Sequence, residues 1–210
     1  MESHKQNMPK VFVIEDDQGM ITLYRGLLDS IGISTRFFTS GEDFFRHWSA
    51  DWRGGLIVDL RMPGMGGMEV LRRLRTLDSP LPAIVVTGHG EIRATVRAMK
   101  LGAIEFLEKP FANSELLEAV QVMLEQGHHQ ELEQSVRTEI EFSLAALSTR
   151  EREVAELITR GLTSREIGEL LSISPRTVEA HRAQALTKTN CSTSIELAAL
   201  FSRFPDLARR

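Results

Sequence analysis

Three short apolar runs, far apart in the sequence, each end in charged residues. The first leads into Glu15-Asp16-Asp17, the second into Asp59, and the third into Lys109. If the runs are parallel strands, these residues meet at one edge of a sheet, which is where open α/β sheets bind ligands. Hard cations prefer oxygen ligands, and an ammonium group can neutralise phosphate charge. The pattern therefore predicts a site for a divalent cation and a phosphoryl group.

The front half of the chain alternates strand-like and helix-like segments. Short runs rich in β-branched and aromatic residues cover 11–14, 35–38, 56–58, 83–86 and 104–107. Apolar residues at helical spacing between them include Met20, Leu23, Leu27, Leu28, Met68, Leu71, Leu74, Val96, Met99 and Leu101. Because parallel strands need crossover connections, the alternation predicts a doubly wound parallel sheet with strand order 2-1-3-4-5.

A helical connector is expected after the sheet. The last helix of the front half is predicted to begin at Asn113 and to end at a break at Gly127. Residues 128–144 contain neither Pro nor Gly and keep apolar residues at helical spacing, so they predict a helical linker. The adjacent His128 and His129 would point to different helix faces, which favours a pair of linker residues over a metal site.

Short helices with clear start signals are predicted from residue 148 onward. Three segments fit the capping-box pattern, in which a hydroxyl and a Glu satisfy free backbone N–H groups: Ser148–Glu151, Thr163–Glu166 and Thr193–Glu196. Ser174-Pro175 adds a fourth start, and Gly161 stands where the first helix should stop. Four short helices in this length predict a compact all-α domain.

The predicted organisation is a domain at 8–127, the linker 128–144 and a domain at 145–210. The net charge of -4 is unevenly spread. Residues 1–147 contain 15 Lys and Arg against 21 Asp and Glu, whereas residues 148–210 contain 10 against 8. The mildly basic C-terminal part is therefore the better candidate for binding a polyanion.

Composition also bears on the compartment. Cys191 is the only cysteine, so no disulfide can form within the chain and a reducing compartment is expected. No apolar run approaches the roughly 20 residues of a membrane span, and the polar start of the chain has no signal-peptide core. We expect a cytoplasmic protein with no membrane partner.

The charged strand ends suit one type of chemistry. Phosphoryl transfer to a carboxylate needs a nucleophilic Asp, a cation, and groups that stabilise charge on the moving phosphoryl. Asp59 would face Glu15 and Asp16 across neighbouring strands, while Thr87 and Lys109 end the fourth and fifth strands. Three crowded carboxylates repel one another, so a bound Mg²⁺ is the expected relief.

The front half resembles the receiver domain of two-component response regulators over residues 10 to about 126. The matching motifs are Val13–Asp17, Val58–Gly67, Val86–Gly90 (Val86-Thr87-Gly88-His89-Gly90) and Gly102–Phe111. This resemblance implies a flavodoxin-like (CheY-like) fold with a five-stranded parallel sheet.

The receiver resemblance also implies residue roles. Asp59 would accept a phosphoryl group from a sensor histidine kinase, and Thr87 and Lys109 would bind the phosphoryl oxygens. Mg²⁺ would be bound by the side chains of Asp16 and Asp59, by Glu15 through water, and by the backbone carbonyl of Arg61. On switching, Phe106 would turn inward and the face made by the fourth helix, fifth strand and fifth helix would dimerise. A cis bond at Lys109-Pro110 is implied as well.

The C-terminal part predicts a helix-turn-helix. In this motif one helix braces and a second enters the major groove of DNA. Residues 163–171 would brace, 172–173 would turn and 174–188 would read. The apolar joint between the two helices would contain Ile167, Leu170, Leu171, Ile173 and Val178.

This part resembles the DNA-binding domain of FixJ/NarL-type regulators, also called LuxR-type. The matching motifs are Leu147–Val154, Gly161–Thr163, Ile167-Gly168 and Ile173–Arg182. The resemblance implies phosphate contacts by Arg176, Thr177, Arg182 and Lys188, and base contacts by Glu179, Ala180, Ala183 and Gln184. An ion pair of Glu179 with Arg182 or Arg176 is an equally open interpretation.

Together the two resemblances predict a two-component response regulator. We expect a transcription factor whose phosphorylation on Asp59 promotes a homodimer on double-stranded promoter DNA, with RNA polymerase as a further candidate partner. We do not expect an enzyme.

Three alternatives remain open at this point. They are a Mg²⁺-dependent aspartyl-phosphate hydrolase, a C-terminal module that binds RNA or protein, and a DNA-binding regulator that ignores phosphorylation.

Overall fold

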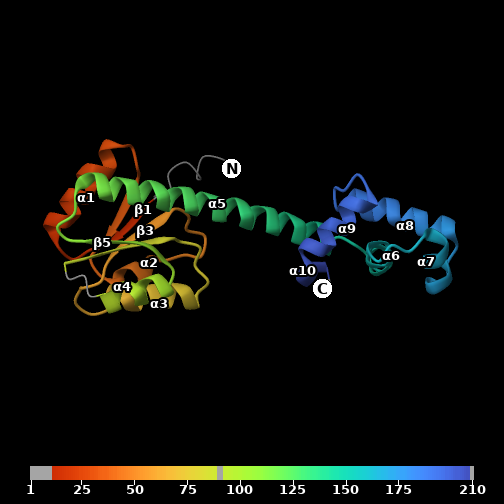
Figure 1. The fold of residues 1–210 in the computed structure, drawn as a ribbon, viewed down its shortest axis with the longest axis horizontal. Coiled ribbons are helices and arrows are strands. Elements are labelled where there is room, and N and C mark those ends of the chain that lie inside the picture. The colour runs from red at the N-terminus through yellow and green to blue at the C-terminus, as the bar shows by residue number, and fades with distance from the viewer. Residues whose placement is uncertain (1–10, 89–91, 209–210) are drawn as a thin grey trace. The chain divides into compact units, whose positions relative to one another are not determined.

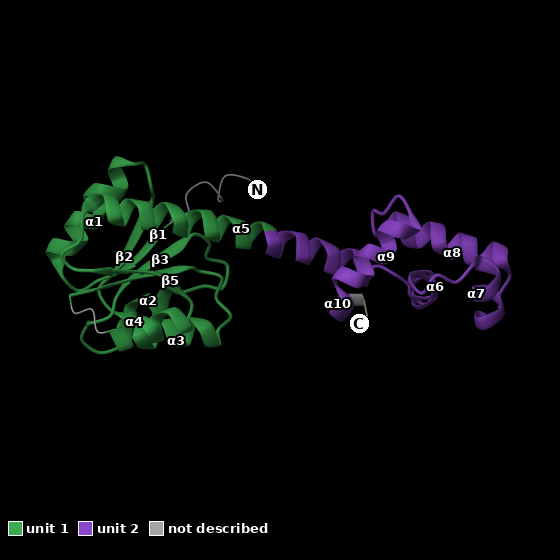
Figure 2. Cartoon of the chain, viewed as in Figure 1, with its two compact units in different colours: residues 1–132 green, residues 133–210 purple. Residues whose placement is uncertain are grey.

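The chain divides into two compact units, residues 1–132 and 133–210 (Figure 2). The computed structural model describes residues 11–88 and 92–208. Outside the described residues lie positions 8–10 of the predicted first domain, the motif residues His89 and Gly90, and the last two residues of the chain. The division between the units falls inside the predicted linker.

The first unit is built on a parallel sheet. Its five strands are β1 (Val11–Ile14), β2 (Thr35–Phe38), β3 (Gly55–Asp59), β4 (Ala83–Thr87) and β5 (Ala103–Glu108). Their order is β2-β1-β3-β4-β5, and every neighbouring pair is parallel, which confirms the predicted topology. Each predicted strand is within one residue of the observed one at either end.

Helices cover both faces of the sheet (Figure 1). The helices that pack here are α1 (Gln18–Ser30), α2 (Gly41–His47), α3 (Gly67–Thr76), α4 (Ile92–Lys100) and α5 (Asn113–Ala145). α1 and α5 lie on one face, and α2, α3 and α4 on the other. Alternate residues of β1 serve the two cores, with Val11 and Val13 on the α1/α5 side and Phe12 and Ile14 on the other.

Two predicted helix faces differ from the observed ones. In α1 the buried residues are Ile21, Tyr24 and Leu28, whereas Leu23 is exposed. In α4 only Ala98 is buried among the described side chains, and Val96 and Met99 are about half exposed. Spacing alone leaves the orientation of a helix open by about one residue, or 100°.

The predicted break at Gly127 is wrong, because α5 continues through it to Ala145. Gly127 is buried, and a Cβ placed on it would lie 2.6 Å from the carbonyl oxygen of Gly54. The glycine therefore allows the helix to pass close to the chain before β3. Its role is close packing and not helix termination.

The second unit is helical from the end of α5 onward. It contains α6 (Thr149–Thr159), α7 (Ser164–Leu171), α8 (Pro175–Lys188), α9 (Ser194–Arg203) and α10 (Pro205–Ala208). The predicted N-caps Ser148, Thr163, Ser174 and Thr193 each accept a hydrogen bond from the backbone N–H three residues on. Two capping boxes are complete, but Glu196 accepts from the backbone of Ser192 instead of Thr193.

Two small cores hold this unit together. One joins the end of α5 to α6, α8, α9 and α10 through Leu144, Ala155, Leu197 and other residues. The other lies between α6, α7 and α8, where Ile167 and Val178 are completely buried. Leu170 is 63% exposed and does not belong to this joint, contrary to prediction, because Leu171 occupies the inward side of the last turn of α7. None of the helices in the described residues combines the length and apolar composition that crossing a membrane requires.

Candidate functional site

The carboxyl edge of the sheet gathers the predicted charged residues. Glu15 follows β1, Asp59 is the last residue of β3, and Lys109 follows β5. The Lys109 Nζ lies 2.7 Å from Glu15 Oε2 and 2.7 Å from Asp59 Oδ2. Glu15 is 1% exposed and Asp59 is 7% exposed, so both carboxylates are buried. The parallel sheet thus joins residues that the sequence separates widely.

An acidic cluster opens from this pocket to solvent. Glu15, Asp16 and Asp59 each offer a carboxylate oxygen, and these oxygens all lie within 4.8 Å of one another. Asp16 is exposed, whereas Asp17 serves as the N-cap of α1 and accepts from the Met20 N–H at 2.9 Å. A set of hard oxygen donors beside solvent fits Mg²⁺, which keeps several waters when it binds to proteins.

The charges of the pocket shift one another's pKa. Burial raises the pKa of Glu15, and the hydrogen bond from Lys109 opposes this rise without cancelling it. Burial alone would lower the pKa of Lys109, but its hydrogen bonds to Asp59 and Glu15 outweigh the burial and raise it. The ammonium group therefore stays charged at neutral pH, where it compensates the two carboxylates.

Of three further predicted residues, Arg61 contacts Asp59 directly, whereas Thr87 and Phe106 belong to the neighbouring strands β4 and β5. The backbone N–H of Arg61 donates to Asp59 Oδ1 at 2.8 Å. Thr87 ends β4 and is buried, and its carbonyl accepts from the Lys109 N–H at 2.8 Å. Phe106 of β5 is half-buried and packs against the core on the α2/α3/α4 side. The Lys109-Pro110 bond is cis, as the receiver resemblance implies.

One contact near this edge was not predicted. The carboxylate of Glu42, at the start of α2, accepts from the backbone N–H of Met65 in the loop after β3. The two residues are 23 positions apart, and neither stands in a motif that signals contact. Only the packing of α2 beside the loop reveals the pair.

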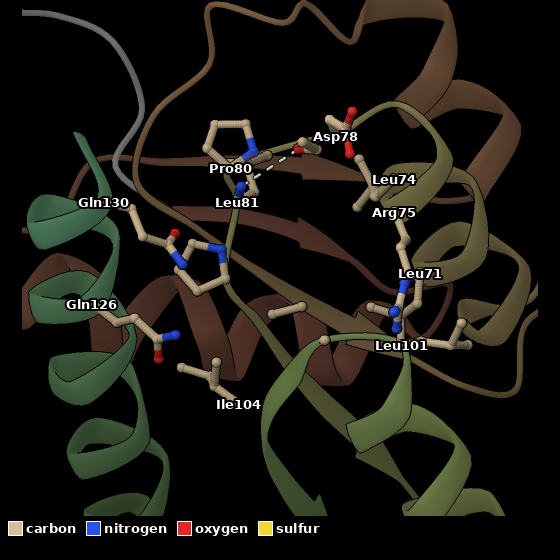
Figure 3. A pocket seen from close by; sticks show the side chains of 14 residues that line it. Leu71, Leu74, Arg75, Asp78, Pro80, Leu81, Leu101, Ile104, Gln126 and Gln130 are labelled. Atoms are coloured by element: carbon tan, nitrogen blue, oxygen red, sulfur yellow. Dashed lines mark hydrogen bonds between the residues drawn. The ribbon is translucent and has the colours of Figure 1, made fainter. Parts of the chain in front are cut away.

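A cavity of the first unit lies away from this site. It has a volume of about 300 Å³ and is bordered by the end of α3, the starts of β4 and β5, and α5 (Figure 3). Gln126 and Gln130 of α5 and Ile104 of β5 line it. It contains none of the predicted phosphoryl or metal residues, so it is separate from the proposed chemistry of this domain.

The predicted reading helix α8 has a buried side and an exposed side. Val178 and Ala185 are completely buried. The predicted DNA contacts that are exposed are Arg176, Thr177, Glu179, Ala180, Ala183, Gln184 and Lys188, while Arg182 is half-buried. Most of the predicted DNA contacts therefore lie on the solvent side.

Two of these residues have partners within the second unit. The Lys188 Nζ donates to Glu151 Oε2 at 2.7 Å, and this hydrogen bond lowers the pKa of the buried Glu151. Lys188 thereby links the end of α8 to the capping box of α6. Glu179 accepts from the Ser164 hydroxyl and lies 3.5 Å from Arg182, so the ion-pair interpretation matches its position in the free chain.

The two parts of the chain match two family models. Residues 11–121 match the response regulator receiver domain, and residues 145–201 match the bacterial regulatory proteins of the luxR family. Both matches have the order and the positions that the motifs predicted.

Similar proteins match along almost the whole chain. The transcriptional regulatory protein FixJ of Bradyrhizobium diazoefficiens is 37% identical over 92% of this chain and 94% of its own length. The tetrathionate response regulatory protein TtrR of Salmonella typhimurium is 34% identical over 96% and 94%.

Solved structures agree with these matches. The response regulator StyR superimposes with a TM-score of 0.87 at 35% identity, covering 93% of this chain and 99% of that one. Full-length FixJ from B. japonicum has a TM-score of 0.55 at 36% identity, covering 93% and 97%. The chain therefore belongs to the two-component response regulators and is a transcription factor that joins a receiver domain to a luxR-type DNA-binding domain.

Proposed function

We propose that Asp59 is the phosphoacceptor of this regulator. The observation that carries the proposal is the position of Lys109, whose ammonium group lies 2.7 Å from both Asp59 and Glu15. In the transfer, an Asp59 carboxylate oxygen forms a bond to phosphorus while the bond from phosphorus to the donor nitrogen breaks, and the donor imidazole takes up a proton. Lys109 and Thr87 stabilise the charge on the phosphoryl oxygens.

The donor set favours Mg²⁺ as the cation. Asp16 and Asp59 would hold it through their carboxylates, Glu15 through water and Arg61 through its carbonyl. When bound, Mg²⁺ supplies charge neutralisation between the acceptor carboxylate and the phosphoryl oxygens. The carboxylate oxygens that lie within 4.8 Å of one another support this assignment.

A regulatory acceptor fits the pocket better than a hydrolase. A hydrolase of this chemistry needs a general acid close to the nucleophile, and two residues after Asp59 stands Arg61, which cannot give up its proton at neutral pH. The chain therefore stores a phosphoryl group and does not turn over a small phosphate ester.

The two family matches indicate one partner for each domain. A receiver domain implies a sensor histidine kinase as donor, and a luxR-type domain implies DNA as target. We further propose that phosphorylation, with Phe106 as the switch residue, makes the chain a homodimer in the cytoplasm that recruits RNA polymerase. The exposed apolar side chains of Val96 and Met99 on α4 support pairing through the α4/β5/α5 face.

The proposed DNA contacts separate into two kinds. Arg176, Thr177 and Arg182 would contact phosphates, and Glu179, Ala180, Ala183 and Gln184 would face base edges. Phosphate contact by Lys188 requires that it leave Glu151, with which it is paired in the free chain. Base contact by Glu179 requires that it leave Ser164 and Arg182 on binding.

Replacement of the acceptor tests the central proposal. Asp59→Asn should stay folded, because Lys109 keeps Glu15 as a partner, but it should gain no phosphoryl mass with acetyl phosphate and Mg²⁺. It should also stay monomeric under conditions where the wild type dimerises, as measured by intact mass and light scattering. Asp29→Asn, an exposed change in α1, is the control and should behave as wild type. A phosphorylated Asp59→Asn chain would overturn the assignment.

Salt dependence tests the proposed phosphate contacts. Arg182→Ala should weaken binding to all DNA sequences alike and reduce the slope of log affinity against log salt by about 1. Arg165→Ala removes an 85% exposed arginine of α7 and serves as control. A loss confined to one DNA sequence would contradict the phosphate role of Arg182.

A further inference from the structure

The loop between β3 and α3, residues 60–66, begins and ends beside Asp59. A Cβ placed on Gly67, where α3 begins, would collide with the Asp59 carbonyl oxygen. The Gly67 N–H donates to the Leu60 carbonyl at 3.3 Å, and the Arg61 N–H donates to the Asp59 carboxylate at 2.8 Å. The two ends of the loop are thus joined beside the acceptor, and its shape sets the backbone around Asp59.

The far side of this loop is held by α2. Glu42 Oε1 accepts from the Met65 N–H at 2.7 Å. Gly64 has φ of +73°, and a Cβ placed there would lie 2.6 Å from the same carboxylate oxygen. A Cβ on Gly41 would lie 2.8 Å from the Met65 carbonyl. Glu42 therefore binds the Met65 N–H, and the preceding Gly41 lies so close to the Met65 carbonyl that a larger residue would not fit.

The position of Glu42 in the first turn of α2 favours its charged form. It is the second residue of α2, whose N-cap Ser40 accepts from the Asp43 N–H. Hydrogen bonds from its own backbone N–H and from that of Met65 hold the pKa of Glu42 below its usual value. At neutral pH the acceptor is a full carboxylate, and hydrogen bonds to charged acceptors are the stronger ones.

We propose that Glu42 is a positioning residue for the phosphoacceptor site. By holding the Met65 N–H, it fixes the loop that begins with Leu60 and Arg61, whose N–H donates to Asp59. The Arg61 carbonyl would then be held in place as a backbone ligand for Mg²⁺. The inference rests on the proposed function of the pocket. Groups that orient metal ligands from outside typically change metal affinity by 10- to 100-fold when removed.

Two variants of Glu42 separate positioning from general stability. Glu42→Ala removes the acceptor, whereas Glu42→Gln keeps an acceptor oxygen at the same reach. Glu69→Ala, which removes an exposed carboxylate paired with Arg72 on α3, is the matched control. All are compared in the full chain, first without metal and then in a Mg²⁺ titration followed by amide NMR.

Glu42→Ala should have two linked effects. Hydrogen exchange of the Met65 amide in the metal-free protein should be at least about 10-fold faster, because its acceptor is gone. The Kd for Mg²⁺ should rise about 10- to 100-fold. Phosphorylation by acetyl phosphate should slow at limiting Mg²⁺ and return to the wild-type rate at saturating Mg²⁺. Glu42→Gln should stay within about 3-fold of wild type in each measurement, and Glu69→Ala should match wild type.

The possible failures are distinguishable. A Glu42→Ala chain that binds Mg²⁺ within twofold of wild type overturns the positioning role, as does a Gln variant that is as weak as the Ala variant. A wild-type chain that binds no Mg²⁺ overturns the proposed function of the pocket instead. Glu42 is exposed, so the Ala variant should fold. If it does not, Glu42→Asp, whose carboxylate is one methylene shorter, takes its place with the same expected losses.

Discussion

In the first unit, Lys109 contacts Glu15 and Asp59, which lie 94 and 50 positions away, whereas in the second unit the starts of α6, α7, α8 and α9 are each capped by a residue three positions before the N–H that it binds. The receiver site is therefore a product of sheet topology, and it holds buried charges that only the whole fold can bring together. The DNA-binding unit relies on local capping and small apolar cores, and its proposed contacts lie at the surface. The first unit should be sensitive to charge, and the second to side-chain volume.

The largest effect is expected from removing the ammonium group of Lys109 from the receiver pocket. Lys109→Met leaves Glu15 and Asp59 as buried carboxylates without their partner, and breaking such a group typically costs about 3–5 kcal/mol of unfolding free energy. Chemical denaturation at neutral pH without Mg²⁺ measures this loss. The loss should shrink as the pH falls, because Glu15 can then take up a proton. A Lys109→Met variant as stable as wild type would contradict the expectation that the first unit is sensitive to the loss of a charge.

A paired substitution in α7 tests the second unit. Ile167→Ala creates a cavity in the completely buried joint and should cost about 2–5 kcal/mol. Leu170→Ala, on the same helix but 63% exposed, should change stability by less than about 0.5 kcal/mol. Denaturation followed by helical circular dichroism measures both. Equal losses would mean that Leu170 belongs to the joint after all.

Two glycines in helices test how much close packing decides the effect of a glycine substitution on stability. Gly127→Ala should destabilise by about 1–3 kcal/mol, although Ala is the better helix former, because its methyl group would meet the Gly54 carbonyl. Gly26→Ala in α1 meets nothing within 4 Å and should stabilise by about 0.5–1 kcal/mol. A stabilising Gly127→Ala would show that α5 does not approach Gly54 this closely.

The smallest expected effect is a pH dependence of the unfolding free energy that is caused by Glu15. Burial raises its folded-state pKa above the ordinary value of 4.5, so the folded chain binds this proton more tightly than the unfolded chain. The stability that this group contributes is complete below pH 4.5 and is lost as the pH rises through the folded-state pKa. Relative to Glu15→Gln, the wild type should therefore lose stability across that window without Mg²⁺. A constant difference between the two proteins would contradict the raised pKa.

The sequence predicts the features that follow from local pattern. Strand ends marked by Asp59 and Lys109 located the pocket, because parallel strands bring their ends together whatever the side chains are. Hydroxyl residues such as Ser148 and Thr163 located the helix starts, because a cap bonds within three residues.

Other features depend on which surfaces pack together. The contact of Glu42 with Met65 and the pair of Lys188 with Glu151 join residues whose spacing carries no signal. The sequence predicts a helix end at Gly127 because it does not reveal that Gly54 lies beside this glycine. The choice between Leu170 and Leu171 also requires the position of α8, because these neighbours lie about 100° apart on α7 and the sequence does not reveal which of them faces inward.

Helix α5 contributes side chains to the interior of both units. Leu116 and Met123 are completely buried in the first, and Leu144 is buried in the second, where Ile140 also packs. Arg137 of the same helix pairs with Asp206. A C-terminal fragment cut at residue 145 would lose part of its own interior, so the smallest autonomous DNA-binding piece should begin upstream of Arg137. Limited proteolysis should accordingly yield a stable fragment that retains several turns of the linker.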